Sequence, residues 1–389
     1  MPDTVNPAKP IFEPKSSIYS FRFPLTRNYI FCHVLFVQIP HTDKRKSIQK
    51  SLILLTKNKE TKPYQSILHN VKSTFLAEDM DNQILVTTLY LKFSSFPKYQ
   101  RDGNFSLKFY SKRFDLAVTS WNTFPSFLRK HLSSLRSLWA SLLMGESIVM
   151  YSEDVTEVTE AVEYLSSIIS PLEYCGEIRP YVTMNDDIIK KDKAILVGTT
   201  NQMVKDVIKK NAKKVNTLDI NGGECIHHIV DNRFLKVIQM NDLTAGVEVM
   251  KEFSRNMIEF LTIFDGFFLK KAPKMKSLED QWNSIEYNEE EVWRYIKGLK
   301  FPSGKEMVYK EFIKTSSFAK YATDKMEKFE AAGVDNLTQL FNGFDMKQYT
   351  NEQIAKISIN LFSLSKSPIL YVEENAKKLM DTIVEAKSN

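Results

Sequence analysis

The chain of 389 residues is longer than a single hydrophobic core usually organises, and its 43% hydrophobic and 12% aromatic content suffices for two or three packed units. The net charge of +6 is a mild excess without the concentrated basic stripe of a nucleic-acid binder; the basic clusters at 44–50 and 209–214 fit solvated charge, with an anionic membrane or acidic partner as the alternative. Three widely separated cysteines without a CxxC pair indicate neither a disulfide framework nor a zinc site, and only 12 glycines disfavour phosphate-binding loops.

Residues 1–17 are expected to form a disordered tail, because this stretch is rich in proline and lacks an apolar core. The same features argue against a signal peptide. The longest apolar stretch, residues 29–39, is interrupted by His33 and Gln38 and is too short to span a bilayer. The sequence therefore predicts a cytoplasmic protein that meets membranes only peripherally.

The first third favours a small α+β unit. Two runs rich in β-branched and aromatic residues, 29–39 and 51–56, flank a short polar segment and predict a hairpin. A helix follows to Phe75, with Thr61 as its expected N-cap and Pro63 in its first turn. Further strands are expected at 84–93 and 105–109, and a helix at 132–144.

The middle third alternates strands and helices. Strands are expected at 147–151, 194–197 and 215–220, separated by a helix from Asp154 to Pro171 and another around 203–208. Asp154 and Glu157 have the spacing of a capping box. Strands separated by helices predict a mostly parallel sheet with right-handed crossovers.

From residue 243 onward the apolar residues keep a helical period. A helix beginning there is expected to end at a charged loop, 270–277. Further helices are predicted at 289–297, 307–318, 322–331 and 354–363, the last with Thr350 and Gln353 as a capping box, and at 367–386.

Catalytic and phosphate-binding motifs are absent from the sequence: it contains no GxxxxGK[ST], GxGxxG, GxSxG or HExxH. The turn 198–201 lies where anions bind at a strand end, but a cap for the following helix explains it better. Adjacent His227 and His228 would point to opposite faces of a strand, so they would not share a metal ion. Buried structural thiols explain Cys175 and Cys225 better than nucleophiles do. The sequence therefore predicts no metal, no cofactor and no enzyme of the ordinary kind.

Four motifs in the middle of the chain carry a family resemblance. They are WASLLMGES (139–147), PLEY (171–174), RPYVT (179–183) and ILVGTTN (195–201). Their order and content resemble the DENN module, whose members have a helix leading into LLGEP, then PLxY, RPYxT and ILGxTN. Ser147 stands where the family usually has proline, and Val197 precedes the glycine where the family has leucine.

The flanking segments are most similar to the DENN domain-containing protein six group. They are FVQ (36–38) with QKSLILL (49–55), and FIKTSSF (312–318) with KMEK (325–328), so the resemblance covers residues 19–363. It implies a longin-like α+β domain at 18–130, a mostly parallel three-layer α/β domain at 131–240, and a helical region at 241–389.

The resemblance also implies a function. DENN modules are guanine nucleotide exchange factors for Rab-type small GTPases, and this group is linked to endosomal recycling. The implied mechanism is stabilisation of a nucleotide-poor, switch-open GTPase, which needs no chemical catalytic residue. The expected location is the cytoplasm and, through the GTPase, the surface of endosomes or vesicles. Position at strand-to-loop junctions makes Arg179, Tyr181, Asn185 and Asn201 candidate GTPase contacts.

Two alternatives remain open. The first is a DENN-fold scaffold, or a GTPase-activating protein of the folliculin type that acts through an arginine of the longin-like part; Arg101, Arg113 and Arg129 are candidates by domain alone. The second is an α/β enzyme that binds a small molecule or nucleotide, which the scarcity of glycine and the absence of a phosphate-loop motif disfavour.

Overall fold

A computed structural model describes residues 11–24, 29–41, 47–57, 62–76, 83, 86–87, 89–90, 104–109, 112–117, 125–174, 176–212, 214–222, 242–272, 275–280, 286–299, 301, 305–366 and 370–388. The chain divides into two compact units, Met1–Met257 and Ile258–Asn389, each described here by itself. The division falls within the long helix α6 (Asp242–Lys271). The finer boundaries at residues 18, 131 and 241 stay a prediction.

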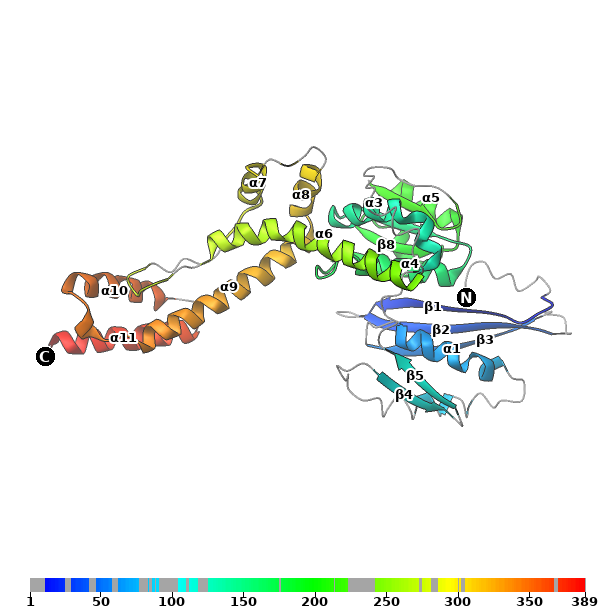
Figure 1. The fold of residues 1–389 in the computed structure, drawn as a ribbon, viewed down its shortest axis with the longest axis horizontal. Coiled ribbons are helices and arrows are strands. Elements are labelled where there is room, and N and C mark those ends of the chain that lie inside the picture. Colours follow the sequence, from blue (N-terminus) through cyan, green and yellow to red (C-terminus); the bar gives the residue numbers. More distant parts are fainter. Residues whose placement is uncertain are drawn as a thin grey trace. The chain divides into compact units, whose positions relative to one another are not determined.

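The first unit contains an antiparallel sheet of β1 (Lys15–Pro24), β2 (Tyr29–Pro40) and β3 (Ser47–Thr56), in that order. Its register places Ile18, Leu35 and Leu52 side by side. These residues belong to a buried cluster completed by the apolar face of helix α1 (Lys62–Leu76), which lies across the sheet in Figure 1. The predicted hairpin of β2 and β3 and the predicted helix are therefore confirmed.

Two expectations for this region were wrong. Strand β1 starts at Lys15, inside the segment 1–17 that was expected to be disordered. The segment 84–93 was expected to be a strand, but its described residues, and Gln83 before it, are helical. Leu89 of this segment is buried in the α1 cluster, so packing decides the conformation here.

The strand expected at 105–109 is present as β4 (Asn104–Phe109), and it pairs with β5 (Lys112–Ala117), which the sequence did not predict. The expected N-cap Thr61 lies outside the described residues.

The second sheet of this unit is parallel, as predicted. It contains β6 (Ser147–Tyr151), β7 (Glu177–Arg179), β8 (Ile195–Thr199) and β9 (Val215–Asp219) in the order β7-β8-β6-β9. The three-residue strand β7 was not predicted. Helices α3 (Leu132–Leu143), α4 (Val155–Ser167) and α5 (Gln202–Asn211) and the short 3-10 helices η2 (Ser126–His131) and η3 (Asp187–Lys190) surround it.

Two glycines of the resemblance motifs fit structural positions. Gly145 ends α3 with a φ of 68°, a conformation that side chains disfavour, and turns the chain into β6. A Cβ atom on Gly198 would lie 2.3 Å from the carbonyl oxygen of Pro180 and 2.4 Å from Cγ1 of Val158. Only glycine therefore lets β8, the chain after β7 and helix α4 approach this closely.

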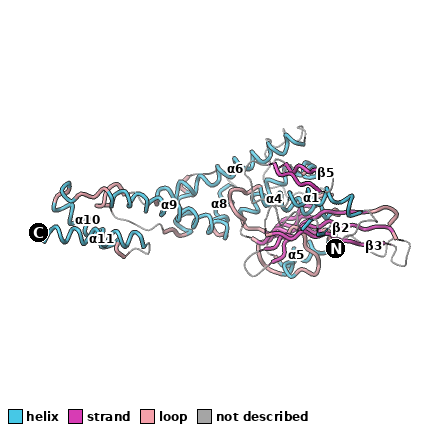
Figure 2. Tube along the Cα trace, turned by 90° about the horizontal axis from the view of Figure 1, so that it is seen from below, coloured by secondary structure: helices cyan, strands magenta, loops and turns pink. Residues whose placement is uncertain are grey.

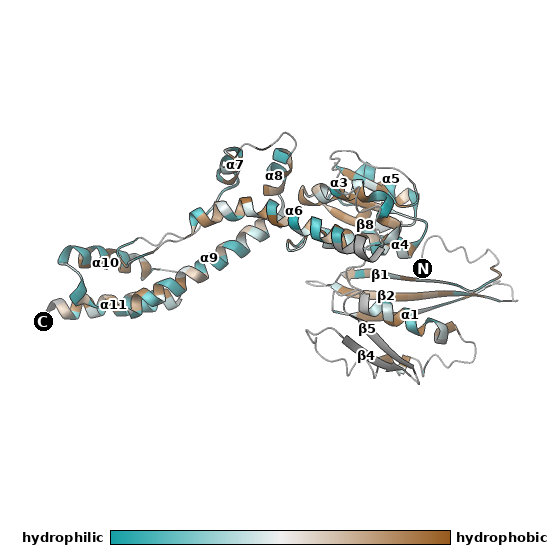
Figure 3. Ribbon diagram, in the orientation of Figure 1, coloured by the Kyte–Doolittle hydropathy of each residue, from teal (hydrophilic) through white to brown (hydrophobic). Residues whose placement is uncertain are grey.

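The second unit is helical in its described part. It holds the end of α6, then α7 (Glu289–Lys297), α8 (Lys305–Ile313), α9 (Ser316–Asn342), the 3-10 helix η5 (Met346–Gln348), α10 (Asn351–Leu364) and α11 (Leu370–Ser388). In Figure 3, hydrophilic and hydrophobic residues alternate along α9 and α11, as expected for helices buried on one side only. Figure 2 shows these helices, joined by loops, in a second view.

The capping box of Thr350 and Gln353 is confirmed by both of its hydrogen bonds. The single helix expected at 307–318 was wrong, because α8 ends at Ile313 and Thr315 caps a new helix, α9, by accepting from the N–H of Phe318. The loop expected from residue 270 begins later, since α6 continues to Lys271. None of the described helices combines the length and apolar character needed to cross a membrane.

Candidate functional site

Helix α4 is the layer that the two sheets of the first unit share. Its Val158 and Val162 face Gly198 of the parallel sheet. In its first turn Val155 packs with Tyr19 of β1 and with buried side chains of β2. The seam between the antiparallel sheet and α4 is therefore the first candidate for a functional surface.

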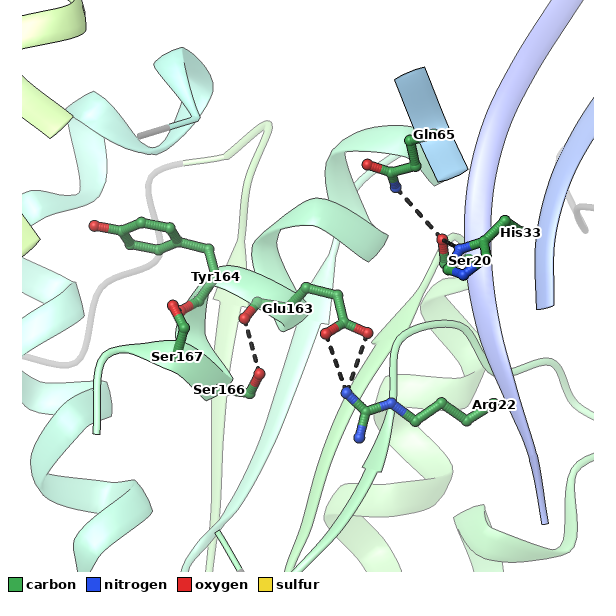
Figure 4. Close-up of polar contacts among 8 residues, drawn as sticks. All are labelled: Ser20, Arg22, His33, Gln65, Glu163, Tyr164, Ser166 and Ser167. Atoms are coloured by element: carbon green, nitrogen blue, oxygen red, sulfur yellow. Dashed lines mark hydrogen bonds and ion pairs between the residues drawn. The ribbon is translucent and has the colours of Figure 1, made fainter. Parts of the chain in front are cut away.

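An ion pair between described residues crosses this seam. The Nη2 atom of Arg22 in β1 lies 3.0 Å and 3.2 Å from the two carboxylate oxygens of Glu163 in α4 (Figure 4). Both side chains are largely buried, with 14% and 19% of their surface exposed. The guanidinium also lies 5.2 Å from the ring centre of Phe31. Limited solvent screening makes such a pair stronger than a surface one.

Arg179, a predicted contact residue, belongs to the same seam. Its Nη1 donates to the backbone oxygen of Arg22 at 3.1 Å, and its Nε donates to Glu177 at 2.8 Å. Only 15% of its side chain is exposed. The bond to Arg22 therefore joins β7 to β1, while the bond to Glu177 stays within β7.

Tyr181 connects the seam to the end of the parallel sheet. Its ring lies 5.8 Å from the ring of Tyr19, and its hydroxyl shares a hydrogen bond of 2.9 Å with the hydroxyl of Thr200, directly after β8. Burial, with the nearby phenol of Tyr181, raises the pKa of Tyr19 to about 12. The Tyr19 phenol is thus a neutral packing group, while Tyr181 packs against it and hydrogen-bonds with Thr200.

Asn201 caps helix α5, as the sequence suggested for this turn. Its Oδ1 accepts from the N–H of Met203 at 2.9 Å, and its own N–H donates to Thr199 Oγ1 at 3.1 Å. Asn185 is exposed in a turn that Thr183 and Asp186 stabilise. The structure therefore brings Arg179, Tyr181 and Asn201 to the seam and the adjoining strand end, whereas no described side-chain contact links Asn185 to them.

A second polar cluster lies where β6 and β9 end, and sequence reasoning missed it. The hydroxyl of Ser152 lies within donating distance of two acceptors, Glu157 Oε2 at 2.8 Å and Asn221 Oδ1 at 2.9 Å, which share its single proton. The N–H of Glu153 also donates to Asn221. The Glu157 carboxylate thus accepts a hydrogen bond from Ser152 instead of completing a capping box, and Asp154 alone caps α4. Ser152 directly follows β6 and Asn221 lies two positions after the end of β9, and this placement at strand ends was the available signal.

This cluster borders a hollow of about 460 Å³ that opens at the same edge of the sheet. Its described lining residues are Ser126, Phe127, Arg129, Lys130, Glu157, Ile220 and Asn221. Arg129 is one of the three arginines considered for a GTPase-activating role. Arg101 lies outside the described residues, and the backbone of Arg113 lies in β5.

Metal and thiol chemistry find little support in the described part of the chain. No group of three or more potential ligands comes together there. His227, His228, Cys175 and Cys225 lie outside the described residues. Cys32 is a buried free thiol whose pKa is raised by burial, so it is a poor nucleophile.

Short stretches of the chain match proteins named DENND6. Protein DENND6A of Gallus gallus is 35% identical over 74 residues, and the DENND6 homolog of Dictyostelium discoideum is 36% identical over 70. Protein DENND6A of Mus musculus is 32% identical over 84 residues. The chain resembles the DENND6 proteins. The resemblance seen in the motifs is thereby confirmed.

The match to the DENND6 proteins is partial on both sides. It covers 17%, 18% and 20% of this chain, in the order given above, and 13%, 9% and 13% of the three relatives. No family model matches the chain. The similarity thus supports a DENN-domain protein of the DENND6 group, while activity and partners are matters for proposal.

Proposed function

We propose that this chain is a guanine nucleotide exchange factor for a Rab-type small GTPase. The observation that carries the proposal is the similarity to DENND6 proteins, joined with a parallel sheet whose motif residues lie at the predicted strands and turns. In this proposal the antiparallel sheet with α1 is the longin-like domain. The two sheets with α4 between them then act as one rigid body against the GTPase.

The proposed mechanism is differential binding. A surface that binds the switch-open, nucleotide-poor GTPase more tightly than the GDP-bound form lowers the free energy of the open state and so speeds release of GDP. Cellular GTP then refills the site. No proton transfer or covalent step is required, so the protein acts as a regulator of a GTPase and not as a chemical catalyst.

The seam supports this mechanism because exchange factors need a preorganised surface. The Arg22–Glu163 pair and the Arg179 contact to β1 fix the antiparallel sheet against α4. Tyr181, Thr200 and Asn201 lie at the adjoining strand end and are held by hydrogen bonds. In this proposal the GTPase meets the protein at that end, and membrane contact on endosomes or vesicles is peripheral, through the GTPase.

The test is release of fluorescent GDP from a panel of Rab GTPases at micromolar concentrations of the protein. We expect faster release from one or two members. Asn185→Ala is the cleanest contact variant, since Asn185 is exposed and its described hydrogen bond uses only the backbone N–H. It should slow release several-fold, whereas Lys210→Ala, exposed in the last turn of α5, should not.

A folded protein that accelerates no member of a broad panel would contradict the proposal. A parallel single-turnover assay of GTP hydrolysis separates the main alternative, because an exchange factor leaves that rate unchanged. Faster hydrolysis would instead favour a GTPase-activating role.

A further inference from the structure

The outer edge of β3 offers a backbone that is ready to pair. Its inner edge pairs with β2 from Ser47 to Thr56, and no described strand pairs with its outer edge. A strand of ten residues at a sheet edge presents a row of N–H and C=O groups to any additional strand. Proteins commonly cover or charge such an edge to prevent unwanted pairing.

A hollow of about 540 Å³ runs along this edge. It is lined by five consecutive residues of β3, from Leu52 to Thr56, and by Tyr64, Val86, Leu89 and Tyr90. Successive side chains of a strand point to opposite faces, so a hollow lined by five in a row follows the edge of the strand and not one face. The opposite wall comes from Tyr64 of α1 and from the helical residues Val86, Leu89 and Tyr90.

The lining is apolar and partly open to solvent. Leu55 is 66% exposed, Tyr90 is 70% exposed, and Val86 is 51% exposed. None of the nine lining residues carries a charge. The charged residues of β3 and of the position directly after it are both cations, Lys50 and Lys57, and they lie on either side of the five lining residues.

We propose that an extended peptide segment of another protein binds in this hollow as a fourth strand next to β3. Main-chain hydrogen bonds to β3 would supply affinity, and alternate apolar side chains would contact Leu55, Val86 and Tyr90, as in other complexes where a peptide adds to an edge strand beside a helix. The two lysines select a peptide that is acidic at its ends and apolar at alternate central positions.

The charges also disfavour a second copy of this chain as the occupant. Antiparallel pairing of two β3 strands centred on the hollow would bring the Lys50 end of one copy against the Lys57 end of the other. Like charges across neighbouring strands are destabilising. An acidic peptide instead places opposite charges at both ends.

The experiment uses the full chain and a fluorescein-labelled peptide, Asp-Asp-Val-Ser-Ile-Thr-Val-Ser-Asp-Asp, followed by fluorescence anisotropy. We expect saturable binding and slower amide hydrogen exchange in β3 when the peptide is bound. N-methylation of alternate peptide nitrogens should weaken binding at least tenfold, because it removes ladder hydrogen bonds. A peptide with lysine at both ends should also bind at least tenfold more weakly.

Leu55→Glu tests the site on the protein side. It should weaken binding at least tenfold, whereas Ile359→Glu, a similarly exposed position on α10, should leave binding unchanged. The double variant Lys50→Glu, Lys57→Glu tests the charges without altering the hollow, and circular dichroism verifies that each variant is folded. No binding up to millimolar peptide, or binding that tolerates N-methylation or Leu55→Glu, would overturn the proposal. So would a dimer in sedimentation experiments that Leu55→Glu converts to monomer, since β3 would then bind a second copy.

Discussion

Gly198 shows how a single residue sets the spacing between layers. Its missing side chain leaves room for Pro180 on one side and for Val158 of α4 on the other. Gly198→Ala should lower the free energy of unfolding by about 1–3 kcal/mol, because the added methyl group forces the backbone or α4 to move. Urea unfolding measures the change.

The matched control for that change is Gly298→Ala at the end of α7. There the nearest atom to the new methyl group would be 3.3 Å away and the backbone is already helical, with φ of −65°. Gly298→Ala should lower the free energy of unfolding much less than Gly198→Ala does. Equal costs would mean that the close packing around Gly198 relaxes easily.

His33 is fully buried between the antiparallel sheet and α1. Its Nδ1 shares a hydrogen bond of 2.9 Å with Ser20, which also accepts from Gln65, as Figure 4 shows. Its ring stacks on Tyr64 with ring centres 4.8 Å apart, and its Nε2 has no hydrogen-bond partner in the described structure. Burial lowers the pKa of His33 from 6.5 to about 4.

This lowered pKa predicts loss of stability in acid. Between pH 6.5 and 4 the unfolded chain binds a proton at His33 that the folded protein does not, so stability falls as the pH falls. The full effect is on the order of 3 kcal/mol, at about 1.4 kcal/mol per pH unit. Hydrogen exchange of α1 at pH 7 and pH 5 measures it. His33→Gln should reduce the difference between the two pH values, and an unchanged difference would assign the acid sensitivity to other groups.

Among single residues of the candidate site, local interactions could be predicted from the sequence and long-range ones could not. The caps Asp154, Asn201 and Thr350 could be predicted, because a cap depends on neighbours a few positions away. The pairing of Arg22 with Glu163 could not, since 141 positions separate the two residues. Whether the Arg179 side chain is exposed or bonds to the backbone of β1 depends on that same long-range arrangement.

Among the elements, those with a clear period were predicted well and those stabilised by pairing were not. Helix α5 and strands β6 and β8 have compact apolar patterns, and these patterns predict their type of secondary structure. β1 alternates serine and arginine with apolar residues and follows several prolines, so it was assigned in part to a disordered tail. β7 has only three residues, and its strand character comes from pairing with β8.

At the element scale, Asn201 offers a test of capping. Asn201→Ala should cost about 1 kcal/mol of stability, because the N–H of Met203 loses its acceptor. Asn201→Ser, which keeps a capping oxygen, should cost a few tenths at most. Chemical unfolding followed by the fluorescence of Trp139 in α3 reports on this unit. Equal losses for alanine and serine would show that Asn201 acts through something other than its cap.

For the whole first unit, the Arg22–Glu163 pair predicts coupling between the antiparallel sheet and helix α4, which also packs on the parallel sheet. In a double-mutant cycle with Arg22→Met and Glu163→Gln we expect a coupling energy of about 1 kcal/mol, at the upper end for exposed pairs, because both side chains are largely buried. Amide hydrogen exchange in β1 and α4 measures it. Additive effects of the two changes would mean that apolar packing alone holds the seam.

The order of strands in the parallel sheet has a consequence for how the protein is made. β6 is flanked by β8 on one side and by β9 on the other, and both follow it far along the chain. At translation rates of roughly 5–20 residues per second, β6 waits on the order of 3–13 s for β9 to be synthesised. Throughout that interval the nascent chain carries an apolar strand with an unpaired edge, so newly made protein is most exposed to chaperones and to aggregation while the ribosome is still translating the segment between β6 and β9.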